Sequence, residues 1–438
     1  MRLSSWLLLA ALSAPAVCGA ATRPRYGGTL RVEMGAAPAA LDPATADAGP
    51  LRSLVFETLV RLDDAGAPQP CLALSWQHDA AAKRWQFNLR PGVKLHDGSS
   101  LTAAVAAPLL QAALPAATVT AAGDAVSIRA NHSLPNLLLD LAHNGWLETG
   151  PFRPAAFDPG RRAAFAANDD YWGGRPFLDA IDVQLGRALR DQLADLELGM
   201  ADVVEVAPTD MRRASGDGRA LWSSAAISLI ALVFAPGPDP RVRGALALSI
   251  DRAPMYTVLL QKQGDVTAAL LPQWISGYAF AFPAAPDLPR ARALVNALPP
   301  AARALTLTYD PGLRAARSLA ERVAVNARDA GLAVQVSPQN PRADVRLVEV
   351  PVAALDPERA LAGLAAALGL EFAPNASPSP AAYYESERKL LDGFRAIPLF
   401  HVPVLYGVSS RVRVYAPPPI TRLGDWRFDN VWLSGTAP

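Results

Sequence analysis

The residue types that most often carry catalysis or bind metals are scattered in this sequence. Its histidines do not have the spacing of metal ligands, and none is paired with a serine or cysteine in a pattern for nucleophilic chemistry. They are His78, His96, His132, His143 and His401. The adjacent carboxylates Asp169 and Asp170 fall in a predicted loop, where neighbouring side chains diverge, so they fit a turn better than an acid–base pair. We therefore expect a protein that is not an enzyme, with no catalytic residue, no metal site and no cofactor.

Motifs of the common enzyme classes are also absent from the sequence. It contains no G-x-S-x-G elbow, no H-E-x-x-H, no Walker loop, no G-x-G-x-x-G and no C-x-x-C. The arginines of "GRALRDQL" (186–193) and "PRVRGAL" (240–246) are expected on solvated helix faces, and a clamp for a ligand carboxylate stays open as an alternative. An exported hydrolase is a further alternative, for which no nucleophile–base arrangement is visible.

Length and composition indicate a folded protein of more than one domain. The chain has 438 residues, of which 51 % are hydrophobic and 18 % charged, so it can bury large cores. The formal net charge is +1, and basic residues are not concentrated in one segment, which argues against a nucleic-acid partner. We expect two or three domains.

The first 21 residues have the pattern of an export signal. Arg2 precedes an apolar run from Trp6 to Leu12, which is too short for a permanent membrane span and is followed by small residues. We predict cleavage between Cys18 and Thr22, and hence an exported, periplasmic protein. Lipid attachment at Cys18 stays open as an alternative, although the preceding Pro-Ala-Val fits a lipobox poorly.

The remaining cysteine, Cys71, has no partner for an internal disulfide once the signal is removed. No histidine neighbours it in the sequence, so we expect a buried apolar thiol rather than a nucleophile. No later segment contains eighteen uninterrupted apolar residues, and we therefore do not expect a membrane-spanning helix.

The second half of the chain has the periodicity of an α/β fold. Residues 304–310 and 332–338 alternate like strands, and they flank a predicted helix with apolar residues on one face between 316 and 327. Strand, helix and strand in this order imply a parallel pair with a right-handed crossover. Asp239-Pro240 predicts the start of another helix, because Asp caps free amides and Pro loses no hydrogen bond there.

The first half of the chain is richer in strands. Residues 29–33 alternate like a strand, and residues 51–62 have helical spacing. Between residues 74 and 130 the period falls to two and turns recur, as in "LSWQHD" against "RWQFNLR" and "TVTA" against "AVSIRA". This pattern predicts a small β-rich unit.

The stretch "RWQFNLRPGVKLHDGSSLTA", residues 84–103, gives these elements a context. Its aromatic strand, Leu-Arg-Pro-Gly turn and His-Asp-Gly turn closely resemble the signature of the extracellular solute-binding proteins of the oligopeptide, dipeptide and nickel class, which serve ABC importers. Further blocks resemble the same family in the same order, and they lie at 26–44, 54–63, 149–183 and 239–260. The resemblance runs from about Tyr26 to about Leu294 and is weaker beyond.

The resemblance implies an α/β, two-lobed periplasmic binding protein fold with an additional β-rich subdomain, closing around a ligand. We expect a signal peptide at 1–21, a discontinuous first lobe at 22–58, 148–236 and 404–438, a β-rich subdomain at 59–147 and a second lobe at 237–403. Two strands, near 232–238 and 400–406, are expected to cross between the lobes.

Two departures from the family pattern concern the ligand. Peptide-binding members usually have an Asn-rich strand where residues 229–234 read "LIALVF", and no counterpart of their Trp-x-x-Asp-Tyr-x-Asp-Pro stretch occurs between Val345 and Tyr383. A buried polar group without a partner costs roughly 2–7 kcal/mol, so these departures argue against a free peptide as the ligand. They predict an apolar cleft with few polar groups.

Five residues are candidates for ligand contact because of their positions relative to these blocks. Large aromatic side chains offer binding surface at a low entropic cost, and the loop at 270–280 faces the cleft in relatives. The candidates are Trp274 and Tyr278 in that loop, Phe234 at the predicted crossing, and Trp146 and Glu148 just before the block at 149–183.

The resemblance implies a monomeric periplasmic protein that captures a small peptide-like, apolar or amphipathic ligand between two hinged lobes. It would deliver this ligand to the permease of an ABC importer, and the higher affinity of the ligand for the closed form would drive closure. The alternative is a non-transport periplasmic scaffold or sensory descendant whose cleft has degenerated.

Overall fold

The computed structural model describes residues 23–42, 46–63, 66–81, 83–131, 134, 136–142, 146–375, 379–416 and 418–435. The predicted export signal, its cleavage site and Cys18 lie outside these residues, as do His132 and His143.

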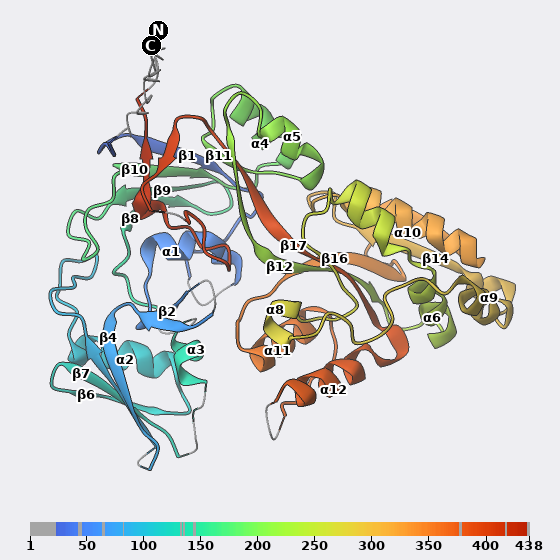
Figure 1. The fold of residues 1–438 in the computed structure, drawn as a ribbon, viewed down its shortest axis with the longest axis horizontal. Helices are drawn as coiled ribbons and strands as arrows, with labels where there is room; N and C mark the ends of the chain where they lie inside the picture. Colours follow the sequence, from blue (N-terminus) through green and yellow to red (C-terminus); the bar gives the residue numbers. More distant parts are fainter. Residues whose placement is uncertain are drawn as a thin grey trace, which may run out of the picture.

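A mixed eleven-stranded sheet runs through both halves of the described chain (Figure 1). In spatial order its strands are β15 (Ala333–Pro338), β14 (Ala304–Tyr309), β16 (Val345–Pro351), β12 (Ala220–Phe234), β17 (Ala396–Val408), β11 (Val203–Glu205), β1 (Thr29–Glu33), β10 (Ala180–Gln184), β9 (Arg162–Ala167) and β8 (Phe152–Asp158), with β13 (Asp265–Val266) paired to β17. Residues 29–33 therefore form the predicted first strand.

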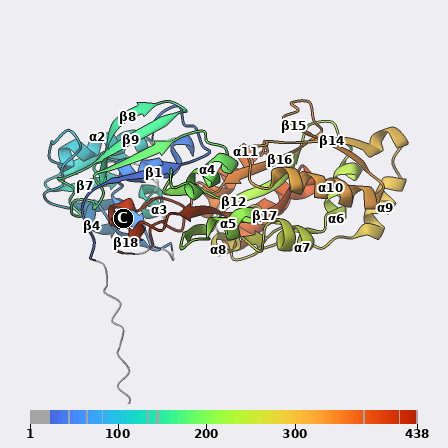
Figure 2. The same cartoon turned by 90° about the horizontal axis from the view of Figure 1, so that it is seen from above.

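The long antiparallel strands β12 and β17 connect the two lobes (Figures 1 and 2). Their pairing shifts register on both sides of Ala226, and such irregularities let a strand bend. The predicted crossing at 400–406 lies within β17. The other crossing lies upstream of residues 232–238, because β12 is already in the core of the second lobe at Leu229.

The first lobe packs β1, β8, β9, β10 and β11 with the short helices α1 (Arg52–Val55), α4 (Leu189–Glu197) and α5 (Met211–Ala214). The antiparallel pair β18 (Val412–Val414) and β19 (Val431–Leu433) completes it. The helix predicted over 51–62 is wrong beyond Val55, because Phe56 is extended and Glu57 forms a β-bridge with Leu147.

The predicted β-rich subdomain is present as a separate four-stranded antiparallel sheet. Its order is β4 (Ala73–Asp79), β5 (Arg84–Leu89), β7 (Ala125–Arg129) and β6 (Thr118–Ala122), and the predicted pairs β4–β5 and β6–β7 are confirmed. The helices α2 (Ala103–Ala113) and α3 (Leu137–Leu141) and the pair β2 (Val60–Leu62) and β3 (Pro68–Pro70) accompany this sheet. Trp85 and Phe87 point into its core, which explains the period of two.

In the second lobe, helices cover both faces of the sheet. They are α6 (Pro240–Ser249), α7 (Arg252–Pro254), α8 (Gln273–Ser276), α9 (Leu288–Asn296), α10 (Ala316–Ala330), α11 (Pro357–Ala367) and α12 (Pro380–Leu391). The predicted parallel pair flanking a helix is confirmed as β14, α10 and β15. Asp239 caps α6 by accepting a hydrogen bond from the Arg241 amide, with Pro240 at the first helical position, as predicted.

The apolar run at 229–234 follows from this two-sided packing. Leu229, Ala231 and Val233 enter the core on one face of the sheet, and Ile230, Leu232 and Phe234 enter the core on the other. A strand buried on both faces reads as a continuous apolar segment. The structure is thus the expected two-lobed α/β fold with a β-rich subdomain, while the exact domain boundaries stay predictions.

Candidate functional site

A cavity of about 320 Å³ lies between the two lobes. The first lobe and its subdomain contribute most of its walls, through the segment after α1, the segment after β2 and the C-terminal segment at 421–429. The second lobe contributes Trp274 and Leu355. The cavity is therefore built from segments that lie far apart in the sequence.

Glu57 lines the cavity, and hydrogen bonds hold both of its carboxylate oxygens. Its Oε1 accepts a hydrogen bond from the Tyr171 hydroxyl at 2.9 Å, and its Oε2 accepts from Trp172 Nε1 at 2.7 Å and Thr149 Oγ1 at 2.8 Å. Burial raises the pKa of the Glu57 carboxyl, and these three hydrogen bonds oppose the increase. All three donors are neutral, so they orient the carboxylate without cancelling its charge.

The C-terminal segment at 421–429, which forms another wall of the cavity, adds further charged groups. Asp429, Arg427 and Arg61 all line the cavity. Burial raises the pKa of the Asp429 carboxyl, and the nearby guanidinium groups of Arg427 and Arg61 oppose this increase. Asp425 lines the cavity as well and is ion-paired with Arg52 at 3.4 Å. The cavity thus presents both carboxylates and guanidinium groups to a ligand.

Aromatic side chains complete the walls. Trp146 lies under the Arg52 guanidinium, at 5.3 Å from the ring centroid. Trp274 bridges the lobes, because its Nε1 donates to the Ala226 carbonyl at 3.4 Å while the Arg422 guanidinium lies 4.5 Å from its ring centroid. Planar rings of this kind offer stacking surface to an organic ligand.

Another contact between the lobes joins α3 of the subdomain to the N-terminus of α11 (Figure 1). Asn136 Nδ2 donates to Asp356 Oδ2 at 2.7 Å, and Arg359 Nε lies 3.0 Å from Asp140 Oδ1. Asp356 also caps α11 through the Arg359 amide at 2.9 Å. We call Asn136, Asp140, Asp356 and Arg359 the α3–α11 latch.

The structure separates the five sequence-based candidates. Trp274 and Trp146 line the cavity. Tyr278 does not line it, and its hydroxyl donates to Glu387 at 2.6 Å. Phe234 is 2 % exposed in the second-lobe core, which leaves almost no surface for a ligand, and Glu148 is exposed outside the cavity lining. Ligand contact by any of them stays a prediction.

The expectation of an apolar cleft is wrong, because several charged side chains line the cavity. These residues come from segments that the sequence does not connect with the cleft. Glu57 is the one charged residue in the stretch "LVFETLV" (54–60), and this pattern is a signal for a buried functional acid. Nothing in the sequence connected residues 421–429 with α1. Cys71, at the cavity wall, is a buried thiol as predicted, and burial raises its pKa to about 12.

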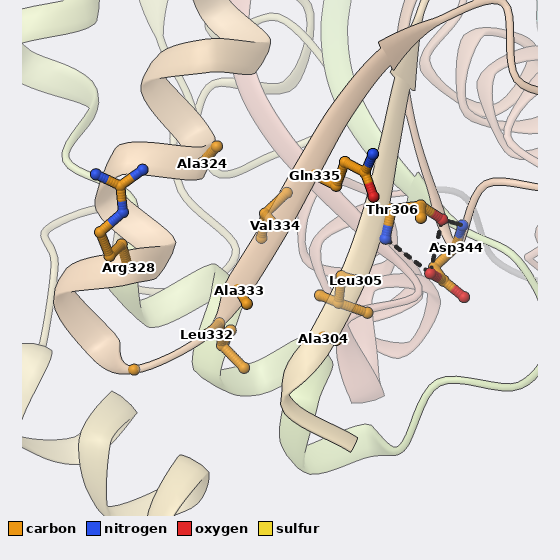
Figure 3. Close-up of a pocket in the computed structure, with 11 residues that line it drawn as sticks. Ala304, Leu305, Thr306, Ala324, Arg328, Leu332, Ala333, Val334, Gln335 and Asp344 are labelled. Atoms are coloured by element: carbon orange, nitrogen blue, oxygen red, sulfur yellow. Dashed lines mark hydrogen bonds between the residues drawn. The ribbon is translucent and has the colours of Figure 1, made fainter. Parts of the chain in front are cut away.

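A larger hollow of about 620 Å³ lies within the second lobe, over β14, β15 and α10 (Figure 3). Arg328 and Asp344 lie on opposite sides of it, and Asp344 Oδ2 already accepts hydrogen bonds from Thr306 N and Oγ1 at 2.8 and 2.7 Å. One lobe alone forms this hollow, and its polar groups do not converge on a common point. It is a weaker candidate for a ligand site than the interlobe cavity.

Among the residues that the structure describes, no helix combines the length and apolar character required to cross a bilayer. Within the same residues, no group of three or more His, Cys, Asp or Glu side chains is arranged to hold a metal ion.

Comparison with curated proteins gives partial sequence matches. The chain is 23 % identical over 186 residues to the nickel-binding protein NikA of Staphylococcus aureus, covering 37 % of this chain and 38 % of that protein. It is 26 % identical over 178 residues to the oligopeptide-binding protein AppA of Bacillus subtilis, covering 38 % and 32 %. The matched segments span less than two fifths of these relatives.

Comparison with solved structures covers almost the whole chain. S. aureus NikA in complex with Ni(L-His)2 superposes with a TM-score of 0.78 at 15 % identity, covering 93 % of this chain and 100 % of that one. B. subtilis AppA in complex with a nonapeptide gives 0.73 at 17 % identity, covering 94 % and 100 %. These likenesses show a shared fold.

The family assignment comes from a separate match. Residues 141–384 fit the family described as "Bacterial extracellular solute-binding proteins, family 5 Middle". This match covers more than half of the chain, and the protein is therefore a member of family 5 of the bacterial extracellular solute-binding proteins.

Proposed function

We propose that this protein captures a small solute in the interlobe cavity and delivers it to the permease of an ABC importer. The observation that carries the proposal is the cavity itself, which combines an oriented buried carboxylate, guanidinium groups and tryptophan side chains. A ligand that contacts both lobes favours the closed arrangement, since it forms these contacts only when the lobes meet. Binding and release require no covalent step.

The lining favours a small zwitterionic ligand, resembling an amino acid or a short peptide. Glu57 and Asp429 suit an ammonium group, and Arg61 and Arg427 suit a carboxylate. The cavity volume of about 320 Å³ is near the lower end of the roughly 300–1,000 Å³ of small-molecule sites. A ligand as long as the nonapeptide bound by AppA would exceed it.

The decisive experiment identifies the cargo. The exported protein is purified without any step that would exchange its bound ligand. It is then denatured, and the released small molecules are identified by mass spectrometry. A recurring zwitterionic species that rebinds in calorimetry supports the proposal. Recurrent release of a purely apolar compound would contradict the ligand class.

The alternative is a periplasmic scaffold or sensory descendant with a degenerate cleft. It is favoured by the missing Asn-rich strand, because residues 229–234 form core packing in place of polar ligand contacts. Absence of any released species, together with no thermal stabilisation by amino acids, short peptides or nickel–histidine mixtures, would support the scaffold.

The proposed location is the periplasm, where a delivery partner of an importer has to act. N-terminal sequencing and intact mass of the exported protein would distinguish cleavage after the predicted signal from lipid attachment at Cys18. A diacylglyceryl mass on Cys18 would establish the anchor.

A further inference from the structure

A cluster of buried polar side chains surrounds the loop that carries Trp274, away from the cavity itself. Glu387 on α12 is 0 % exposed and His401 on β17 is 1 % exposed. Neither belongs to the cavity lining. A buried carboxyl group costs free energy unless its oxygens are fully hydrogen-bonded, so its presence in this core calls for a specific role.

Glu387 binds both ends of that loop. Its Oε1 accepts hydrogen bonds from the backbone amides of Leu270 and Leu271, the latter at 3.2 Å. Its Oε2 accepts from the Tyr278 hydroxyl at 2.6 Å. A single carboxylate therefore joins the residues before and after Trp274.

His401 fixes the same backbone from the opposite side. Its Nε2 lies 2.8 Å from the Leu270 carbonyl oxygen, so the backbone of Leu270 is held through its N–H by α12 and through its C=O by the interlobe strand β17. The base of the loop is closed separately, since Ala281 N donates to the Ala268 carbonyl at 3.0 Å. We call residues 267–282 the Trp274 arch.

The arch has little freedom left at its apex. The short helix α8 carries Trp274 and ends at Gly277, whose φ of 81° suits glycine. From there Tyr278 turns back to Glu387 and packs edge-on against Tyr384, with ring centroids 5.2 Å apart. The indole of Trp274 then reaches the Ala226 carbonyl and the Arg422 guanidinium across the cleft.

We propose that Glu387 and His401 are positioning residues for ligand binding, which hold the Trp274 arch rigid and so fix the tryptophan at the second-lobe wall of the cavity. The proposal depends on the proposed function for its biological meaning, but the positioning itself can be measured without any ligand. It also assigns a role to Tyr278 that differs from direct ligand contact.

The test uses the full protein with its tryptophans replaced by 5-fluorotryptophan and observed by 19F NMR. The variant Trp274→Phe identifies the Trp274 resonance, and Trp85→Phe identifies that of a distant subdomain tryptophan. In Glu387→Gln the side-chain NH₂ group, itself a donor, replaces one acceptor oxygen that faces the donors of Leu270, Leu271 and Tyr278. We therefore expect the Trp274 resonance to shift or broaden while the Trp85 resonance stays unchanged. Glu385→Gln is the matched control, since this exposed residue lies on the same helix.

A second readout separates positioning from a general effect on folding. The titratable group that contacts Glu387 is Tyr278, whose ring packs against Tyr384, and His401 binds the carbonyl of Leu270, whose amide donates to Glu387. Burial raises the pKa of Glu387 to about 7 and lowers that of His401 to about 4. We therefore expect the wild-type Trp274 resonance to titrate near neutral pH and to lose this titration in Glu387→Gln.

Should Glu387→Gln fail to fold, Tyr278→Phe removes one hydrogen bond of the arch with little change in shape. We expect it to move the Trp274 resonance in the same direction as Glu387→Gln, by a smaller amount. An unchanged Trp274 resonance in every folded variant would overturn the proposal. That result would leave the proposed function standing, because cargo identification does not depend on it.

Discussion

The Arg422 guanidinium lies 4.5 Å from the centroid of the Trp274 ring, which joins the C-terminal segment of the first lobe to the arch of the second lobe. Both residues line the interlobe cavity. A contact of this kind forms only when the lobes meet, so it contributes to the closed state and to the ligand site together.

Replacing Arg422 by Met should weaken ligand binding. A cation–π contact contributes about 0.5–2 kcal/mol, so we expect the dissociation constant of the recovered cargo to rise about twofold to thirtyfold. Isothermal calorimetry measures this change. Arg212→Met, at an exposed position on α5, is the control and should bind as wild type.

The α3–α11 latch should set part of the balance between open and closed forms. Arg359 is partly exposed, so its ion pair with Asp140 contributes only about 0.5–1 kcal/mol, and Arg359→Met should shift the open-to-closed ratio about twofold to fivefold. Small-angle X-ray scattering should show a larger mean radius of gyration. Arg317→Met, which breaks an exposed pair within α10, should not change it.

Glu57 should recognise the ammonium group of the cargo. Hydrogen bonds to charged groups contribute about 1.5–3 kcal/mol, so Glu57→Gln should weaken binding of the recovered amine by about tenfold to a hundredfold. The wild type should also reject the N-acetylated cargo, whereas Glu57→Gln should bind both forms similarly. Equal discrimination in both proteins would exclude this role, and Glu197→Gln, on the surface of the first lobe, is the control.

Glu387 and His401 should make opposite contributions to the pH dependence of stability. Between pH 4.5 and 7 the folded state binds more protons at Glu387 than the unfolded chain does, so stability falls there as pH rises. Between pH 4 and 6.5 the unfolded chain binds more protons at His401, so stability falls there as pH drops. Each shift corresponds to about 3 kcal/mol, and the two contributions nearly cancel in the overlapping window.

Single variants should reveal each contribution. Relative to wild type, Glu387→Gln should lose stability on acidification from pH 6.5 to 4, and His401→Asn should lose it as pH rises from 4.5 to 7. Urea unfolding at a series of pH values measures both trends. Identical pH profiles for wild type and the two variants would contradict the assignment, and Glu385→Gln should follow the wild type throughout.

Local patterns in the sequence predicted the elements whose residues interact with near neighbours. The alternation around Trp85 and Phe87 predicted the β4–β5 hairpin, and Asp239-Pro240 predicted the start of α6. The helix predicted after Leu51 is wrong beyond Val55, because the bridge between Glu57 and Leu147 replaces helical hydrogen bonds with a contact to a distant segment. Helical spacing cannot report such a partner.

The candidate site was less accessible to prediction for the same reason. The positions of Trp146 just before one family-like block and of Trp274 in the loop after another predict ligand contact, and both residues line the cavity. Phe234 was placed at the crossing, but the register shifts near Ala226 move the bend upstream and leave Phe234 in the core. Tyr278 was correctly placed on the loop, but the side on which it packs depends on Glu387, more than a hundred residues away.

The sequence by itself determined the α/β character, the β-rich subdomain and the membership in a two-lobed family, because periodicity, turns and helix caps are encoded within a few neighbouring residues. Only the tertiary structure decided the chemistry of the cleft. Glu57, Asp429 and Trp274 come from three remote segments, and the direction of each side chain is fixed by hydrogen bonds and packing that form only after the lobes have assembled.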